Sequence, residues 1–216
     1  FNNHSDPSAH AAIVCGNSNA TDGLYNVIID GANTVVDTYD PGGAGQECKI
    51  HNNFTVTNGS FQVNGASNPF DVGGDVLVSA GKMFGDGSAP TGAMSFGSLT
   101  IESGAEFRAT SGTTTLNGNF TNNGTFTHND GKILSAAATY VTGSGATVFY
   151  DFESSAGQTR FQIDVTIENN FTTSGSASTT YIWLGTTLTM GTATSAATLV
   201  HGQSVIWVYA YSAGHL

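Results

Sequence analysis

Apolar residues alternate with polar ones along most of the chain, in runs too short for helices. Phe54 and Val56, and then Phe61 and Val63, are each separated by one polar residue. An alternation of period two places apolar side chains on one face of a strand and polar side chains on the other. No segment of ten or more residues has apolar positions at the 3.6-residue period of a helix. The pattern therefore predicts an all-β protein with almost no helix.

Similar strand-like segments recur at intervals of about 19–23 residues. When the segment that begins at Asp75 is set over the one that begins at Ser98, Val76 aligns with Leu99 and Phe84 aligns with Phe107. Phe61 precedes Phe84 by the same interval. We therefore expect Phe61, Phe84 and Phe107 to lie above one another as an aromatic ladder.

The tripeptide Asn-Phe-Thr also recurs, beginning at Asn53, Asn119 and Asn170. The first two copies continue into similar segments that reach Phe61 and Phe126. These copies are expected to occupy equivalent places in different repeats.

The length of the repeat indicates the fold class. A period of about 19–23 residues is too short for a helical-pair repeat or a propeller blade, and it suits a coil of two or three short strands. Stacked coils of this kind form a right-handed parallel β-helix, or β-solenoid, which we predict for residues 24–216. Residues 1–23 are expected to be an N-terminal arm or cap. The alternative is a β-sandwich, in which the aromatic ladder would be divided between layers.

Glycine-containing dipeptides are expected at the corners of the coils. Asn-Gly, Ser-Gly and Asp-Gly steps favour turns in which one residue has a positive φ. The predicted corner glycines are Gly59, Gly104, Gly124 and Gly131.

The two ends of the chain contain candidate assembly segments. Unpaired strands at the ends of a solenoid can accept a strand of another subunit. A candidate donor strand consists of Ala11, Ala12, Ile13 and Val14. A candidate cap or assembly surface consists of Val205, Ile206, Trp207, Val208, Tyr209 and Tyr211. Trp and Tyr side chains there are expected either to pack in a cap or to stack on sugars.

Charge narrows the range of partners. The net charge is −11, and the five basic residues are scattered along the chain. Binding of nucleic acid requires clustered cations, so it is not expected. No apolar run approaches the length of a membrane span, so insertion into a membrane is not expected either.

Cys15 and Cys48 are the two cysteines. They lie too far apart along the chain to match a zinc motif, in which ligands come in closely spaced pairs. In an oxidising compartment they are expected to form a disulfide, and the alternative is two buried thiols.

Residues 98–128 resemble the repeat units of very large secreted bacterial surface proteins and adhesins. The resemblance extends over roughly residues 50–175. Those repeats are parallel β-helices similar to the passenger stalks of autotransporters. The resemblance implies an extracellular or cell-surface protein with a structural or adhesive role, such as a filament subunit, a surface-layer subunit or a stalk segment. Its expected partners are further copies of itself, other cell-surface components or glycans.

Acidic residues in glycine-rich segments are the candidate metal ligands. Asp71, Asp75 and Asp86 form one group, and Asp37 and Asp40 form another. Carboxylates in such loops suit Ca²⁺, which accepts several oxygen ligands with flexible geometry. The alternative is that they are solvated turn residues. Parallel β-helices also include polysaccharide lyases and hydrolases, but no local catalytic motif occurs. We therefore expect no enzyme, with a carbohydrate-binding or carbohydrate-active protein as the alternative.

Overall fold

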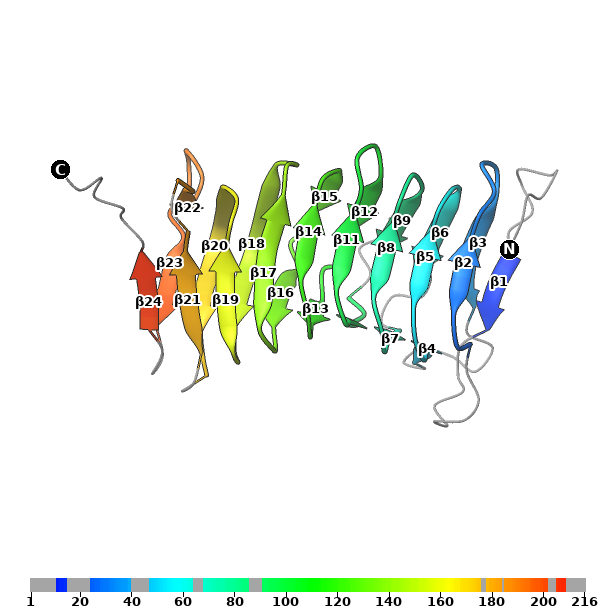
Figure 1. The fold of residues 1–216 in the computed structure, drawn as a ribbon, viewed down its shortest axis with the longest axis horizontal. Coiled ribbons are helices and arrows are strands. Elements are labelled where there is room, and N and C mark those ends of the chain that lie inside the picture. The colour runs from blue at the N-terminus through cyan, green and yellow to red at the C-terminus, as the bar shows by residue number, and fades with distance from the viewer. Residues whose placement is uncertain are drawn as a thin grey trace, which may run out of the picture.

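Short parallel strands form all the regular structure of the described residues (Figure 1). The structure is a computed structural model that describes residues 11–14, 24–39, 47–63, 68–85, 91–175, 178–183, 185–201 and 205–208. Within these ranges there is no helix, and so none with the length and apolar character needed to cross a membrane. The strands form three parallel sheets, which we number 1 to 3.

Sheet 1 has six strands. In spatial order they are β1 (Ala11–Val14), β3 (Val35–Tyr39), β6 (Ser60–Val63), β9 (Lys82–Gly85), β12 (Glu106–Arg108) and β15 (Thr125–Thr127).

Sheet 2 has nine strands. They are β4 (Cys48–Ile50), β7 (Phe70–Val72), β10 (Met94–Phe96), β13 (Thr113–Leu116), β16 (Lys132–Ser135), β18 (Thr147–Ser154), β20 (Val165–Thr173) and β22 (Leu188–Met190), with β23 (Thr198–His201) also paired to β20.

Sheet 3 also has nine strands, and they cross the front of the molecule in Figure 1. They are β2 (Val27–Ile29), β5 (Phe54–Val56), β8 (Val76–Val78), β11 (Leu99–Ile101), β14 (Phe120–Asn122), β17 (Thr139–Gly143), β19 (Gln158–Phe161), β21 (Thr179–Ile182) and β24 (Val205–Val208).

The strand register confirms the predicted solenoid. Along sheet 3 the aligned residues of successive coils are Phe54, Val76, Leu99, Phe120, Val141, Phe161 and Ile182. The coils therefore repeat about every 21 residues, over about 7 turns. Each coil hydrogen-bonds to the coils on either side of it, as in a solenoid whose repeats contact only their neighbours. The β-sandwich alternative is wrong.

The predicted ladder of Phe61, Phe84 and Phe107 is wrong by one residue at its middle rung. Phe61 and Phe107 are both partners of Met83, which is fully buried. Phe84 instead aligns with Gln62 and Arg108. A one-residue change of register moves a side chain to the opposite face of a strand. The sequence offset that pairs Val76 with Leu99 in sheet 3 therefore does not apply in sheet 1, where Met83 pairs with Phe107.

Phenylalanine dominates the core along the whole stack. Ten of the 13 phenylalanines rank among the largest fully buried side chains. Neighbouring rings are in contact within a coil, with centroids 4.6 Å apart for Phe54 and Phe61, and from coil to coil, with centroids 6.1 Å apart for Phe107 and Phe126. Full burial of one such side chain contributes about 1.5–3 kcal/mol, so the inward alternation accounts for much of the stability.

The cross-section changes after β15. β15 is the last strand of sheet 1, and the next coils contain the long strands β18 and β20, of 8 and 9 residues. The pairing of β18 with β20 changes register between Phe149 and Asp151, so Glu168 and Asn169 form a bulge in β20 opposite the single residue Tyr150 of β18. A bulge of this kind bends a strand locally. Two strands per coil, of which the one in sheet 2 is long, thus replace three short ones.

The predicted corner glycines have two different roles. Gly59 and Gly104 have φ values of +84°, as expected for tight turns. The Asp130-Gly131 step also has a positive φ, at Asp130, but the expectation is wrong for the Asn123-Gly124 step, where neither residue has one. Gly131 is needed for space instead, since a Cβ there would lie 2.2 Å from the carbonyl oxygen of Thr110 on the neighbouring coil.

Candidate functional site

The structure describes one of the two cysteines. Cys48 is buried in β4, and Cys15 lies outside the described residues. The proposed disulfide between them stays a prediction.

Two of the candidate calcium ligands have protein partners of their own. The Asp71 carboxylate forms an ion pair with Lys49 at 2.7 Å, and this hydrogen bond raises the pKa of Lys49. Asp75 lies at the corner before β8, where its Oδ1 accepts a hydrogen bond of 2.7 Å from the backbone N–H of Ser98. Both carboxylates therefore connect one coil to the next.

The remaining calcium candidates give no further support to a metal site. Asp37 lies in β3 of sheet 1, while Asp40 and Asp86 lie outside the described residues. Within the part of the chain that the structure describes, no group of three or more His, Cys, Asp or Glu side chains is arranged to hold a metal ion. Calcium binding stays a prediction.

The two candidate assembly segments lie at opposite ends of the solenoid. Ala11–Val14 forms β1, which pairs in parallel with β3 of the same chain and is the first strand of sheet 1. Val205–Val208 forms β24, the last strand of sheet 3. Tyr209 and Tyr211 lie outside the described residues.

A row of polar side chains connects successive coils along the corner before sheet 3. Each side chain accepts a hydrogen bond from the backbone N–H of the equivalent residue one coil further on. The five bonds are 3.1 Å from Asn53 to Asn26, 3.0 Å from Asp75 to Asn53, 2.7 Å from Ser98 to Asp75, 3.1 Å from Asn119 to Ser98 and 3.0 Å from Tyr140 to Asn119. This row explains why asparagine precedes phenylalanine at Asn53 and Asn119.

The same row becomes aromatic in the last coils. Tyr140 aligns with Arg160, Arg160 with Tyr181, and Tyr181 with Trp207. The Arg160 guanidinium carbon lies 5.1 Å from the ring centroid of Tyr140, 5.2 Å from that of Tyr181 and 6.0 Å from that of Trp183. These are cation–π distances. We call Tyr140, Arg160, Tyr181, Trp183 and Trp207 the aromatic row.

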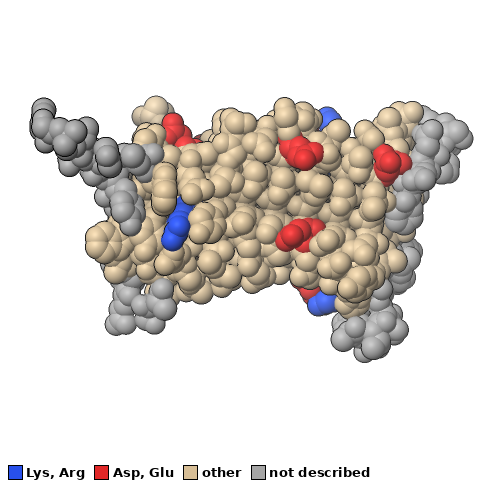
Figure 2. Space-filling view, in the orientation of Figure 1, with Lys and Arg blue, Asp and Glu red and all other residues tan. Residues whose placement is uncertain are grey.

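Arg160 differs from the three lysines of the chain in its surroundings. Lys49, Lys82 and Lys132 each form an ion pair with a carboxylate on the adjacent coil, at 2.7, 3.3 and 2.8 Å. Arg160 instead donates a hydrogen bond of 2.7 Å to the side-chain oxygen of Gln158 and lies over aromatic rings. Figure 2 shows how few charged side chains interrupt this face of the molecule.

An open depression lies beside the aromatic row. It has a volume of about 520 Å³ and is lined by the corner glycines Gly143, Gly145 and Gly185 together with polar side chains that include Gln162 and Asp164. The backbone N–H of Gln162 bonds to the carbonyl oxygen of Val141, and that of Trp183 bonds to the carbonyl oxygen of Phe161. Gln162 and Trp183 thus directly follow aligned inward residues of sheet 3, one coil apart.

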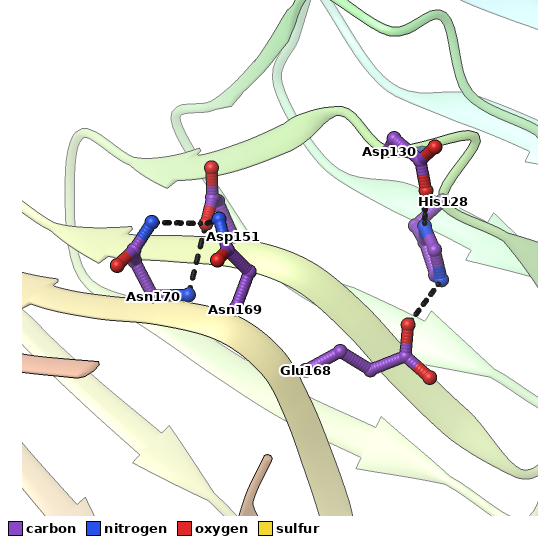
Figure 3. A network of polar contacts seen from close by, with 6 residues as sticks. All are labelled: His128, Asp130, Asp151, Glu168, Asn169 and Asn170. Atoms are coloured by element: carbon purple, nitrogen blue, oxygen red, sulfur yellow. Dashed lines mark hydrogen bonds and ion pairs between the residues drawn. The ribbon is translucent and has the colours of Figure 1, made fainter. Parts of the chain in front are cut away.

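A second polar network surrounds the bulge in β20 (Figure 3). The Oδ1 of Asp151 accepts hydrogen bonds from the backbone N–H and the side-chain amide of Asn170 at 2.9 and 3.0 Å, and from the Asn169 amide at 2.9 Å. The third Asn-Phe-Thr copy therefore lies in sheet 2, at a bulge, and is not equivalent to the first two copies.

His128 completes this network by bridging the turn after β15 to β20. Its Nδ1 accepts the backbone N–H of Asp130 at 3.0 Å, and its Nε2 lies 3.2 Å from a carboxylate oxygen of Glu168 (Figure 3). Its ring stacks on Tyr150, with centroids 5.7 Å apart. Because these partners are other side chains and backbone, the network acts to hold the bulge in place.

Together these features define a parallel β-solenoid repeat protein. No protein-family model, no curated protein and no solved structure matches the chain.

The sequence interpretation missed Tyr140, Arg160 and Tyr181. They belong to three different short segments, and they come together because each lies one coil after the one before it. The available signal was weak, since an arginine flanked by tyrosines at one coil length on either side is visible only once the coil length is known.

Proposed function

We propose that the protein is an extracellular structural and adhesive module whose copies associate end to end. The observation that carries this proposal is the distribution of exposed apolar side chains. Apart from Trp183, the large hydrophobic residues that are exposed lie in the first coil or the last strands of the described chain. They are Leu24, Tyr25 and Ile28 at one end and Leu199, Val200, Val205 and Trp207 at the other.

The sheet topology supports association between opposite ends. Sheet 3 begins with β2 and ends with β24, and every neighbouring pair between them is parallel. A second copy whose first coil stacked on the β24 end would continue the parallel stack in the same direction. Addition of a strand to a sheet edge is a common mode of recognition. A contact between opposite ends of identical copies leaves two ends open, so repeated association produces a filament.

The extracellular location rests on the resemblance of residues 98–128 to repeats of secreted surface proteins. A disulfide between Cys15 and Cys48 belongs to the same proposal, because disulfides persist in oxidising environments. The role proposed for the chain is mechanical, with adhesion on its lateral faces, and it includes no catalysis.

The test uses one blocking substitution at each end. Ile28→Asp places a charge on β2, and Val205→Asp places one on β24. Charged residues on edge strands hinder strand addition. The matched control is Thr100→Asp, in β11 at the centre of sheet 3. Sedimentation velocity and electron microscopy of the purified chain should show rods that lengthen with concentration for the wild type and the control. Each blocked variant should remain a monomer.

Mixing the two blocked variants sharpens the test. Each variant retains one unmodified end, so an equimolar mixture should form heterodimers and nothing longer. A wild-type chain that stays monomeric up to the highest soluble concentration would overturn the proposal. So would filaments that persist in both blocked variants.

A further inference from the structure

The aromatic row has the geometry of a stacking platform. Tyr140, Arg160, Tyr181 and Trp207 come from successive strands β17, β19, β21 and β24 of one sheet, in which neighbouring strands lie about 4.8 Å apart, and Trp183 directly follows β21. Tyr140 and Tyr181 are therefore about 10 Å apart, with Arg160 between them. Trp183 is 42% exposed and Trp207 is 54% exposed.

Arg160 orders the platform. Its guanidinium lies over three rings and is also bound to Gln158, so the tyrosine rings have a fixed neighbour on the surface. A guanidinium stacked on rings is a favourable cation–π contact even at an exposed site. Aromatic side chains held in advance lose little conformational freedom when a ligand binds, which favours binding.

Hydrogen-bonding groups lie next to the platform. Gln162 and Trp183 occupy equivalent positions in neighbouring coils. Gln162 also lines the depression. Asp164 and Thr186 line the same depression, and Asp164 accepts the backbone N–H of Thr187 at 2.6 Å. Flat apolar rings beside amide, carboxylate and hydroxyl groups match a ligand that has apolar faces and polar edges.

We infer that the aromatic row and the adjoining depression bind an extended, neutral polysaccharide. Pyranose rings present apolar C–H faces that stack on aromatic side chains, and their hydroxyls bond to amides and carboxylates. The spacing of strands is close to the length of one sugar residue, so successive sugars of an extended chain would meet successive rungs. A net charge of −11 opposes the binding of polyanions, which favours a neutral ligand over an acidic one.

This inference rests on the adhesive part of the proposed function by naming the chemistry of its partner. It is independent of association between the ends, because the platform is a lateral face. All binding measurements therefore use the Ile28→Asp background, so that avidity from filaments does not contribute. Failure of end-to-end association then leaves the binding result unaffected, and the reverse also holds.

Tryptophan fluorescence provides a direct readout, because both tryptophans of the protein belong to the aromatic row. The probes are soluble hexasaccharides of cellulose, xylan and chitin, followed by pull-down on the corresponding insoluble polymers. At least one probe should shift the emission in a saturable manner. Tyr181→Ala and Trp183→Ala should each weaken that binding about tenfold. Tyr25→Ala, an exposed aromatic at the other end of the molecule, should leave it unchanged.

Three results would overturn the inference. They are the absence of a saturable shift with every probe, equal binding by the Tyr181→Ala and Tyr25→Ala variants, and binding confined to an acidic polysaccharide such as alginate. Thermal unfolding of each variant identifies misfolding. Where Tyr181→Ala unfolds at a lower temperature, Tyr181→Leu replaces it, because leucine retains the apolar volume but not the ring.

Discussion

The coils before and after β15 use the same parallel backbone pairing but differ in their interiors. In the earlier coils, the last inward position of the sheet 2 strands is apolar, with Ile50, Val72 and Leu116 almost fully buried. In the later coils the aligned positions carry hydroxyls, at Ser135, Ser154 and Thr173. These three are also buried, with exposed fractions of 0%, 0% and 1%.

The hydroxyls of Ser135 and Ser154 are tolerated because both bond to Thr159 across a corner between sheets 2 and 3. Thr159 lies at the centre, with its Oγ1 3.0 Å from the Oγ of Ser135 and 2.9 Å from that of Ser154. Ser135 also donates to Thr139 at 2.9 Å. A buried hydroxyl without a partner costs about 1–3 kcal/mol, whereas a bonded one is close to neutral. The comparison teaches that a stacked coil can replace an apolar row by a polar one if neighbouring coils supply the partners.

The largest expected effect concerns the apolar half. Phe107→Ala should lower the free energy of unfolding by about 3–5 kcal/mol, because it leaves a cavity between Phe96 and Phe126, whose centroids each lie 6.1 Å from that of Phe107. Urea denaturation followed by circular dichroism measures the change. Phe107→Leu is the control and should lose less. A loss below about 1 kcal/mol for the alanine variant would contradict the role assigned to the aromatic core.

The next effect concerns the hydroxyl half. Thr159→Val should cost about 1–3 kcal/mol, because it removes a shared partner of the buried hydroxyls of Ser135 and Ser154. Thr180→Val is the matched control, since Thr180 aligns with Thr159, is equally buried and has an Oγ1 with no hydrogen-bond partner among the described residues. That control should be neutral or stabilising in the same denaturation experiment. Equal losses in the two variants would show that the hydroxyl network contributes nothing specific.

The apolar half was the part that the sequence could predict. Its alternation is regular, and the predicted alignment of Val76 with Leu99 is confirmed. The error at Phe84 arose because one offset was applied to the whole coil. The distances between partners differ from sheet to sheet, since loops at the corners have unequal lengths. Met83 is also apolar, so composition alone did not reveal the shift.

The hydroxyl half and the aromatic row could not be predicted in the same way. Serine and threonine occur on both faces of the strands, so the alternation does not indicate which of them is buried. Ser135, Ser154 and Thr159 look like surface residues until the register is known. Arg160 likewise acquires its neighbours only from coils on both sides. Local pattern therefore determined the fold class, but pairing between distant segments determined the site.

The smallest expected effect compares ion pairs of the two halves through their pH dependence. Burial alone would raise the pKa of Glu153, but hydrogen bonds from Lys132 and Ser174 and the charge of Lys132 lower it below its ordinary value of 4.5. Because the folded state holds this carboxylate deprotonated, the contribution to stability is present above about pH 4.5 and is lost as the pH falls below that value. Glu153→Gln should therefore lower the free energy of unfolding at pH 7 by less than about 1 kcal/mol, and the difference from the wild type should shrink as the pH falls below 4.5.

The matched control for this prediction is Glu106→Gln, which removes the carboxylate that pairs with Lys82 in the earlier coils. That pair is more exposed, with side-chain exposures of 56% and 28% against 37% and 19% for Lys132 and Glu153. Solvent screens it more strongly, so its loss at pH 7 should be smaller. Urea denaturation of both variants at pH 7 and pH 3 makes the comparison. A Glu153→Gln loss that grows as the pH falls would contradict the stabilising role of the charged carboxylate. It would mean that the bulged half of the solenoid tolerates this charge at a cost and is not stabilised by it.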